Sequence, residues 1–402
     1  MNKPKIRFNE FENIWTKSKL GELYEIYSGN TPSRSDSRNY QNGEIPWIKT
    51  TDLNNSIIYF NEEKISVYGA RKLKVLPEKS VLIAMYGGFN QIGRTGILAY
   101  PATINQALAA LVPVNEIDPN FLLNFLNFKK ESWRNVAASS RKDPNITKND
   151  VEKFIISFPS LPEQSAIGTL FRTLDDLLAS YKDNLTNYQS FKVTMLSKMF
   201  PKVGQTVPEI RLDGFVGEWE IKKFKSISTK RGKSNSKGYD YPAYSVSNQS
   251  GLIPQSEQFE GSRLENLEKI SYKIVEPNEF AYNPARINVG SVAFNDLDKT
   301  VIVSSLYVIF SLDKSINNSY ALLFIKSPEF NKEVRRNTEG SVREYLFYEN
   351  FANIRIPIPP SLEEQQAIGT YFSNFDNLIN SHQEKITQLE TLKKKLLQDM
   401  FI

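Results

Sequence analysis

The chain contains one long segment twice. Residues 159–200 and 360–401 align without a gap at an offset of 201 in a chain of 402 residues, and 18 of the 42 aligned positions are identical. A second match joins the starts of the two halves, because residues 4–15 align with residues 208–219 at an offset of 204. Solenoids and propellers repeat every roughly 20–50 residues, so a repeat this long predicts a whole domain with a connector in each copy.

Between these shared segments the two halves differ. Residues 20–155 and 225–355 are similar in length but barely alike in sequence. A constant element joined to a divergent element, twice over, indicates that the constant part sets the geometry. The divergent part then reads something different in each half.

Composition limits the class of protein. The length fits about two to four domains of roughly 100–200 residues each. There is no cysteine, which excludes a disulfide scaffold and a cysteine-containing zinc site and fits a reducing compartment. The N-terminus has no apolar segment of the secretory type, and no run approaches about 18 apolar residues. The sequence therefore predicts a cytoplasmic protein that does not cross a membrane.

Charge gives a weak indication of a partner. Residues 1–207 carry 26 Lys and Arg against 20 Asp and Glu, whereas residues 208–402 carry 24 against 25. Basic clusters lie in the divergent segments, at Arg71-Lys72-Leu73-Lys74, Arg141-Lys142, Lys230-Arg231-Gly232-Lys233 and Arg335-Arg336. One such cluster is usually a solvated surface, but together they suggest binding to nucleic acid.

The repeated segments predict two long helices. Ser160 with Glu163, and Ser361 with Glu364, match the capping box at a helix start. Apolar or aromatic residues then recur in alternating steps of three and four, which is the pattern of a coiled coil. We expect the helix–helix or partner interface to use Phe171, Leu174, Leu178, Leu185, Phe372, Phe375, Ile379 and Ile386.

Each helix is expected to run nearly 40 residues, or about 57–60 Å at the rise of an α-helix. A helix this long with one apolar stripe needs a partner, and the other copy in the same chain is the obvious one. If the globular units sit at opposite ends of the pair, the helices are antiparallel. If the units sit side by side, the helices are parallel.

The order of these features resembles the DNA-specificity subunit of type I restriction-modification systems. The resemblance covers essentially the whole chain and rests on PSLPEQ followed by AIG in residues 159–168, on PSLEEQ followed by AIG in residues 360–369, and on a divergent domain before each helix. Looser family features occur in the divergent parts, at residues 45–50, 91–93, 105–106 and 282–290.

The resemblance implies an α+β fold with two pseudo-symmetric mixed α/β target-recognition domains separated by an antiparallel two-helix coiled coil. The expected domains are the first target-recognition domain at 1–157, the first conserved helical region at 158–207, the second target-recognition domain at 208–357 and the second conserved helical region at 358–402.

The resemblance also implies a non-catalytic reader. In that family each recognition domain reads one half of a bipartite, asymmetric DNA sequence, and the helix pair sets the unspecified spacer. The implied partners are double-stranded DNA, two modification (methyltransferase) subunits and restriction (motor-nuclease) subunits. No cofactor is expected in this chain, because S-adenosylmethionine belongs to the modification subunit and ATP with Mg to the restriction subunit.

The residues agree with a protein that has no chemistry of its own. The closest match to the N/D-P-P-aromatic motif of a methyltransferase, Asn283-Pro284-Ala285-Arg286, lacks the second proline and the aromatic residue. A Pro-Asp dipeptide, which usually begins a nuclease site, and a phosphate-binding loop are both missing. The only histidine, His382, falls on the helical seam, which favours a structural role, so no metal site is expected.

Each recognition domain is expected to mix strands and helices. Residues 80–86 and 300–310 have the pattern of strands, and residues 120–130 and 319–330 that of helices. DNA contacts are then expected on loops between strands. The candidates are Lys49, Thr50, Tyr86, Asn90, Gln91 and Arg94 in the first domain, and Ser245, Asn248, Tyr282, Asn283, Arg286 and Asn288 in the second.

Base chemistry ranks these candidates. Arginine pairs with guanine, and asparagine or glutamine pairs with adenine, so Arg94, Gln91, Arg286 and Asn288 are the sharper candidates for base reading. The alternative is that Asn and Gly only form turns here. Two other functions stay open: a fused restriction enzyme with its own active site, and a non-catalytic coiled-coil scaffold whose divergent domains bind ligands other than DNA.

Overall fold

The computed structural model describes residues 3–88, 90–137, 145–202, 204–248, 251–258, 269–337 and 345–402. The chain divides into two compact units. Unit 1 comprises Met1–Asp183 with Gln383–Ile402, and unit 2 comprises Asn184–His382. Arg141 and Lys142, one of the basic clusters, lie outside the described residues. The domain boundaries expected from the sequence stay a prediction.

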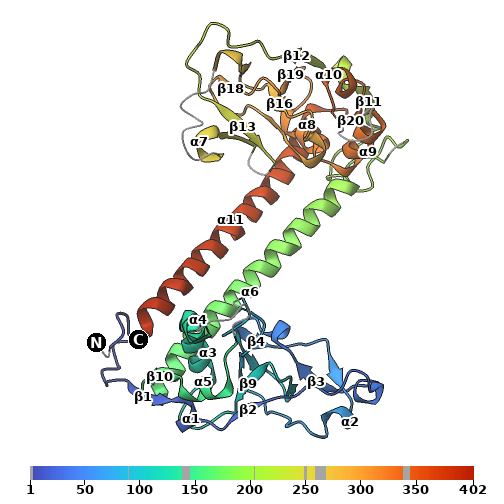
Figure 1. The fold of residues 1–402 in the computed structure, drawn as a ribbon. Helices are drawn as coiled ribbons and strands as arrows, with labels where there is room; N and C mark the ends of the chain where they lie inside the picture. The colour runs from blue at the N-terminus through green and yellow to red at the C-terminus, as the bar shows by residue number, and fades with distance from the viewer. Residues whose placement is uncertain are drawn as a thin grey trace. The chain divides into compact units, whose positions relative to one another are not determined.

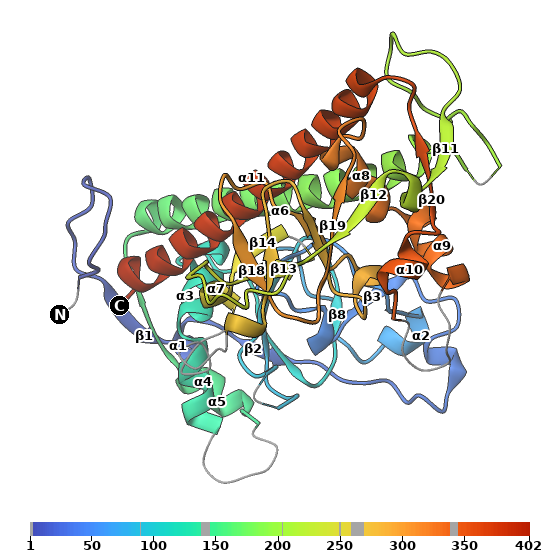
Figure 2. The ribbon, with the colours of Figure 1, turned by 90° about the horizontal axis from the view of Figure 1, so that it is seen from above.

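Unit 1 is a mixed α/β structure. Its elements are β1 (Thr16–Lys19), α1 (Leu20–Leu23), β2 (Ile26–Ser28), η1 (Ser37–Asn39), β3 (Ile45–Ile48), η2 (Thr50–Asp52), β4 (Ser56–Ile58), β5 (Lys64–Ile65), α2 (Val67–Ala70), β6 (Val81–Ala84), β7 (Thr95–Leu98), β8 (Thr103–Ile104), β9 (Leu108–Leu111), α3 (Pro119–Phe128), α4 (Lys130–Ala137), α5 (Lys148–Lys153) and β10 (Ile155–Phe158), followed by the long helix α6 (Leu161–Lys198). Within this unit, α4 and α5 lie at one end and α2 at the other (Figures 1 and 2).

Unit 2 repeats this order of elements in outline. Its elements are β11 (Glu220–Lys223), η3 (Phe224–Ser226), β12 (Ser228–Arg231), β13 (Tyr244–Ser247), β14 (Gly251–Pro254), α7 (Gln255–Gln258), η4 (Lys269–Ser271), β15 (Lys273–Val275), β16 (Phe280–Tyr282), η5 (Ile287–Val289), β17 (Val292–Phe294), β18 (Val301–Val303), β19 (Val308–Leu312), α8 (Asn318–Ile325), α9 (Pro328–Asn337), α10 (Tyr348–Phe351) and β20 (Arg355–Ile358), followed by the long helix α11 (Leu362–Met400).

The main sheets of the two units share one strand order. In unit 1 the order is β2-β9-β6-β7, with β4 added in parallel beside β7, and in unit 2 it is β12-β19-β16-β17. The central pair is antiparallel in both, with Val81 opposite Leu111 and Phe280 opposite Phe310. Strands β6 and β9 are buried along their whole length, which explains their continuous apolar runs. Two divergent sequences therefore form the same sheet, and the α+β fold with two pseudo-symmetric mixed α/β domains is confirmed.

Some elements differ from the sequence prediction. Residues 300–310, predicted as one strand, contain β18 and the start of β19, because a turn in which the Tyr307 N–H donates to the Ser304 carbonyl separates them. The helix predicted at 120–130 is confirmed as α3. The helix predicted at 319–330 ends at Ile325, and the Ser327 hydroxyl then accepts from the N–H of Phe330 at 3.2 Å at the start of α9. Pro328, which has no N–H to donate, suits a first helical position.

The two long helices form as predicted, α6 in green and α11 in red in Figure 1. Within unit 1, Lys182 Nζ lies 2.7 Å from Glu390 Oε1, and Lys393 pairs with Asp175. Residue numbers rise along one helix as they fall along the other. The pairing is therefore antiparallel, and the parallel alternative is wrong.

The same pairing direction is found within unit 2. The rings of Tyr188 and His382 lie 5.1 Å apart, and Lys192 pairs with Asp376. His382 thus packs at the seam against an aromatic ring, in the structural position expected for it.

Each long helix begins in the core of one unit and ends in the core of the other. Phe401, which follows α11, is buried in unit 1, with its ring 5.5 Å from Phe121 and 5.7 Å from Phe171. Phe200, which follows α6, is buried in unit 2, with its ring 5.5 Å from Tyr320 and 5.7 Å from Phe324. These two phenylalanines occupy equivalent positions of the sequence repeat.

Candidate nucleic-acid interface

A buried ion pair fastens the start of each repeat to its long helix. Arg7 donates from Nε and Nη2 to the two carboxylate oxygens of Glu163, each at 2.7 Å, and Nη2 also donates to the Asn13 carbonyl. Arg211 binds Glu364 with the same two-pronged geometry and the same distances. Only 1% of Glu163 is exposed. A bidentate arginine suits a buried carboxylate because its planar fork satisfies both oxygens.

The capping-box prediction for these glutamates needs correction. The Ser361 hydroxyl does accept from the Glu364 N–H, at 3.1 Å, as that motif requires. The carboxylates of Glu163 and Glu364, however, bind the arginines of the N-terminal matching segments. The glutamates therefore join two parts of each repeat as well as lying at a helix start.

The neighbouring glutamines tie each long helix to the start of α3 or α8. Gln164 Oε1 accepts from the Asp118 N–H at 2.9 Å, and Gln365 Oε1 accepts from the Asn317 N–H at 2.8 Å. Gly168 permits this close approach, because a Cβ there would lie 2.8 Å from Asp118 Oδ1. The P-S-L-x-E-Q…A-I-G motif is thus a joint between helix and domain.

In unit 1 a hairpin loop joins β6 to β7. We call it loop 1, and its described residues are 85–88 and 90–94. Gly87 and Gly88 have φ values of +115° and +76°, which residues with a side chain rarely adopt. Tyr86 and Asn90 are exposed, and Arg94 is half-buried with Nε donating to the Asn90 carbonyl at 3.1 Å. Loop 1 therefore presents an aromatic, an amide and a guanidinium group.

Gln91 lies differently from the other candidates of loop 1. Its side-chain oxygen is buried and has no hydrogen-bond partner within the described part of the chain. A Cβ on Gly87 would lie 2.8 Å from Gln91 Cβ, so the loop folds back over this side chain. Gln91 is therefore partly exposed, with its side-chain oxygen turned away from solvent.

In unit 2 the equivalent hairpin loop is residues 283–291 between β16 and β17, which we call loop 2. Asn283 forms a turn, since its Oδ1 accepts from the Ala285 N–H at 3.0 Å. The short helix η5 follows, with Ile287 buried and Gly290 ending it at a φ of +88°. Arg286 and Asn288 are exposed on either side of Ile287. Both candidates therefore face solvent from a loop whose backbone is ordered by the Asn283 turn and by η5.

The two loops are held in the same way. The Ile146 N–H donates to the Met85 carbonyl at 3.0 Å, and the Leu346 N–H donates to the Pro284 carbonyl at 2.9 Å. Both donor residues are fully buried. A segment from the end of each divergent domain therefore fastens the base of each hairpin loop.

Four other predicted DNA contacts lie outside loops 1 and 2 and differ in their exposure. Lys49 Nζ pairs with Glu63 at 2.7 Å, and Thr50 is half-buried where it begins η2. Asn248 is exposed after β13. Only 6% of Ser245, within β13, is exposed.

Tyr282 is fully buried in the core of unit 2. Burial raises the pKa of its hydroxyl well above the ordinary value. With Ser245 it presents no side chain at the surface, so burial argues against the prediction that these two contact DNA. Both residues lie in short strands that are buried on both faces: Tyr244, Ser245 and Val246 are all buried in β13, and all three residues of β16 are buried.

The predicted seam residues divide by burial. Phe171, Leu174, Leu178, Phe372 and Ile386 are buried, whereas Leu185, Phe375 and Ile379 are half-buried. Phe372 joins the core of unit 2 directly. The seam is thus buried at Phe171 and Phe372 near the start of each helix, more solvated at Leu185, Phe375 and Ile379, and buried again at Ile386.

Three exposed residues beside the loops were missed by the sequence reasoning about contacts. Tyr345 and Phe347 stack with ring centroids 5.9 Å apart and planes at 9°, on either side of the buried Leu346 that fastens loop 2. Gln106 is exposed next to the base of loop 1, since the Met85 N–H donates to the carbonyl of Ala107. Residues 345–347 read Tyr-Leu-Phe, a continuous apolar run, so nothing in the sequence indicated which side chains are exposed.

Two of the basic clusters, at residues 230–233 and 335–336, are partly neutralised. Lys230 pairs with Glu349 at 2.7 Å, Arg231 lies 3.7 Å from Glu279, and Arg336 pairs with Glu333 at 2.6 Å.

The described residues contain no group of three or more His, Cys, Asp or Glu that could hold a metal ion. Among the helices of the described residues, none has both the length and the apolar character needed to cross a bilayer.

Comparison with known proteins matches both repeats. The family model for the type I restriction modification DNA specificity domain matches residues 12–187 and again residues 216–391. The MjaIX type I restriction enzyme specificity subunit of Methanocaldococcus jannaschii is 22% identical, over 95% of this chain and 91% of that protein. The HindI specificity subunit of Haemophilus influenzae is 27% identical, over 36% of this chain and 32% of that protein.

Solved structures share the fold. The S subunit of a type I restriction-modification system from M. genitalium superposes with a TM-score of 0.64 at 14% identity, over 100% of this chain and 99% of that one. A chain from a study of complex assembly and conformational transition of the type I R-M system gives a TM-score of 0.55 at 16% identity, over 96% and 97% of the two chains.

Proposed function

The chain belongs to the type I restriction modification DNA specificity family, and on that basis we propose that loops 1 and 2 each read one half of a bipartite, asymmetric DNA sequence. The chain is a DNA-specificity subunit of a type I restriction enzyme. Specificity subunits of this family are non-catalytic, which argues against a fused restriction enzyme. The match over both halves also favours DNA over other ligands.

One observation carries the proposal of two half-sites. Loops 1 and 2 join equivalent strands of equivalent sheets and are fastened by equivalent backbone hydrogen bonds, yet their residues are unrelated. Two loops in equivalent positions with different side chains are suited to reading two different sequences. An asymmetric bipartite site follows from that difference.

The proposed base contacts follow from side-chain chemistry and exposure. In unit 2, Arg286 offers the two-pronged donor that pairs with guanine O6 and N7, and Asn288 offers the donor and acceptor that pair with adenine. In unit 1, Asn90 and Arg94 offer the same two chemistries, and Tyr86 adds an aromatic surface. The stacked Tyr345 and Phe347 supply an apolar surface beside loop 2, of the kind that contacts thymine methyl groups.

The repeated framework supports a second part of the proposal. Equivalent joints at Arg7–Glu163 and Arg211–Glu364 make the surroundings of the two long helices similar. We infer that each repeat binds one modification subunit, that restriction subunits complete the enzyme, and that the complex works in the cytoplasm. S-adenosylmethionine then belongs to the modification subunits, and ATP with Mg to the restriction subunits.

A paired insertion tests the proposal that the helices set the spacer. Seven residues inserted near the middle of both α6 and α11 keep the heptad seam in register and lengthen each helix by about 10 Å. The preferred spacer should grow by about three base pairs at 3.4 Å each, while the bases read in each half stay the same. Methylome sequencing of cells that carry the variant and its partner subunits measures both quantities.

The same seven-residue insertion in α6 alone is the control, because it makes the two helices unequal in length by about 10 Å. It should impair methylation rather than shift the spacer. Altered half-site bases with an unchanged spacer in the double insertion would contradict the proposal.

A further inference from the structure

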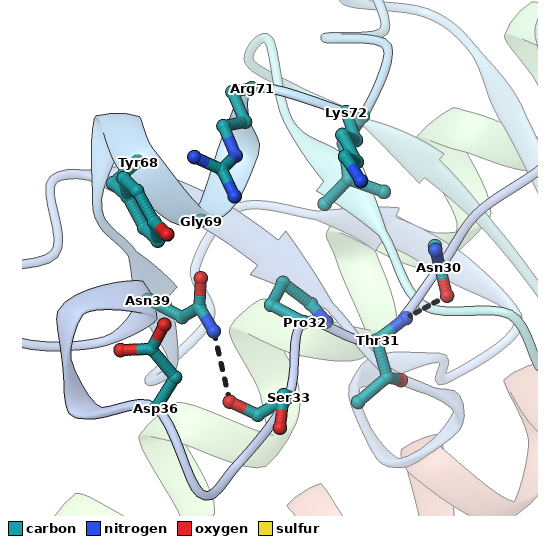
Figure 3. Close-up of a pocket in the computed structure, with 11 residues that line it drawn as sticks. Asn30, Thr31, Pro32, Ser33, Asp36, Asn39, Tyr68, Gly69, Arg71 and Lys72 are labelled. Atoms are coloured by element: carbon teal, nitrogen blue, oxygen red, sulfur yellow. Dashed lines mark hydrogen bonds between the residues drawn. The ribbon is translucent and has the colours of Figure 1, made fainter.

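Unit 1 contains a polar cavity between residues 30–39 and residues 68–73, with a volume of about 260 Å³. Figure 3 shows Arg71 and Lys72 entering it from the segment after α2, while Ser33 and Asn39 face them from the segment that contains η1. Asn30 lies at the side nearest Lys72. None of these residues was among the predicted DNA contacts.

The floor of the cavity is held by hydrogen bonds. Asn39 is nearly buried, and its Nδ2 donates to the Ser33 carbonyl at 2.9 Å. The backbone carbonyl of Asn39 accepts from the Ser66 N–H at 2.9 Å. Gly69 permits the close packing of α2 here, because a Cβ would lie 2.4 Å from the Asn39 carbonyl oxygen. The cavity is therefore a formed feature of the fold.

Most charges around the cavity are already paired. Arg34 and Lys49 both bind Glu63, and Arg38 binds Asp36 through two hydrogen bonds of 2.9 and 2.8 Å. The hydrogen bond from Arg38 is the main cause that lowers the pKa of Asp36, so this carboxylate stays ionised and compensated.

Arg71 and Lys72 are the exceptions. Both are exposed, and neither has an ion pair with any residue that the structure describes. The Arg71 guanidinium lies 3.8 Å from the centre of the Tyr68 ring, which holds it by a cation–π contact. Two positive charges outside ion pairs, one of them held in place, therefore stand over a polar cavity that Asp36, paired with Arg38, also lines.

The cavity connects with loop 1. The Thr31 hydroxyl donates to Gln106 Oε1, and the carbonyl of the next residue, Ala107, accepts from the N–H of Met85 at the base of loop 1. Gln106 is exposed between them. Thr31, which lines the cavity, is therefore linked through Gln106 and Ala107 to the base of loop 1.

We propose that this cavity binds a phosphate group of the DNA backbone beside the half-site that loop 1 reads. Arg71 and Lys72 supply the positive charge, and the Asn30 and Asn39 amides with the Ser33 hydroxyl supply neutral polar groups around it. Phosphate contacts hold a protein in register on the duplex without reading sequence. The inference rests on the proposed function, since it assumes that unit 1 binds DNA.

Salt dependence of DNA binding tests the inference directly. The full chain, in complex with the subunits that copurify with it, is titrated with its cognate duplex at several salt concentrations. Losing one phosphate contact lowers the slope of log K against log salt by about 0.9 for duplex DNA. The double variant Arg71→Ala with Lys72→Ala should show at least this loss, with unchanged preference between cognate and altered half-sites.

Two further variants separate a local contact from a general charge effect. Lys153→Ala removes one exposed charge from α5, at the other end of unit 1, and should leave the slope nearly unchanged (Figure 2). Arg71→Lys should keep most of the slope, because an ammonium also neutralises a phosphate. If Arg71→Lys instead relaxes sequence preference, the cavity reads a base and the proposal is wrong.

The two levels of inference can fail separately. If the wild-type complex does not prefer its cognate duplex over a scrambled one, the proposed function fails. If that preference holds but the double variant Arg71→Ala with Lys72→Ala matches Lys153→Ala in slope and affinity, only the phosphate site fails. Circular dichroism of each variant checks that the fold is intact.

Discussion

Units 1 and 2 agree where the sequence repeats and differ where it diverges. Arg7 with Glu163 and Arg211 with Glu364 form the same bidentate pair, and the final phenylalanine of each repeat fills the equivalent core position. Loop 1 is bent by glycines with positive φ, whereas loop 2 contains a short helix. Identical residues thus build the framework, and the side chains exposed on the loops are free to differ.

The comparison shows how one fold can carry two specificities. A framework residue is constrained by buried partners, so changing it alone leaves a cavity or an unpaired charge. An exposed loop residue has no such partners and can change at little cost in stability. The separation of joint from loop therefore permits one half-site to vary while the other stays the same.

The largest effect is expected at the shared core position. Phe401→Ala should destabilise unit 1, and Phe200→Ala should destabilise unit 2, each by about 3–5 kcal/mol, because a buried aromatic ring leaves a cavity. Denaturant unfolding, followed by hydrogen exchange within each unit, measures the loss. The matched control is Phe60→Ala, at an exposed phenylalanine of unit 1.

Equal destabilisation of both units by Phe401→Ala would show that the units unfold as one body. No destabilisation of unit 1 by that variant would mean that Phe401 does not belong to its core.

A smaller and unequal effect is expected along the seam. Leu178→Ala should cost about 2–3 kcal/mol, since Leu178 is buried, and Ile379→Ala, at a half-buried position, should cost about 1–2 kcal/mol. The difference between their urea midpoints measures the asymmetry. The stripe would not be the helix–helix interface if both variants unfolded like the wild type.

The smallest effect in energy should be confined to one half-site. Arg286→Ala should relax recognition by about 1–3 kcal/mol at positions read by unit 2, because a bidentate contact to guanine is lost. Arg94→Ala is the matched variant in unit 1 and should relax the other half-site. Methylome sequencing compares the two, and loss of specificity in both halves from either variant would break the comparison.

Part of the site could be predicted from the sequence. Gly87, Gly88 and Gly93 bracket a polar stretch, which marks a loop locally in the sequence. Arg286 and Asn288 were expected on a loop between strands, and both lie on loop 2. Tyr282, by contrast, lies only a few residues from exposed Arg286 and is fully buried, because β16 is covered on both faces.

The sequence by itself determined the duplication, the two long helices and their seam, and the positions of the two loops along the chain. These features are periodic or local, so a few consecutive residues specify them. Only the tertiary structure decided the antiparallel pairing, the binding of Glu163 by Arg7 and the place of Phe401 in the core of unit 1. Each of these joins residues far apart in the chain, and such contacts depend on how all the buried groups are satisfied at once, which no local pattern records.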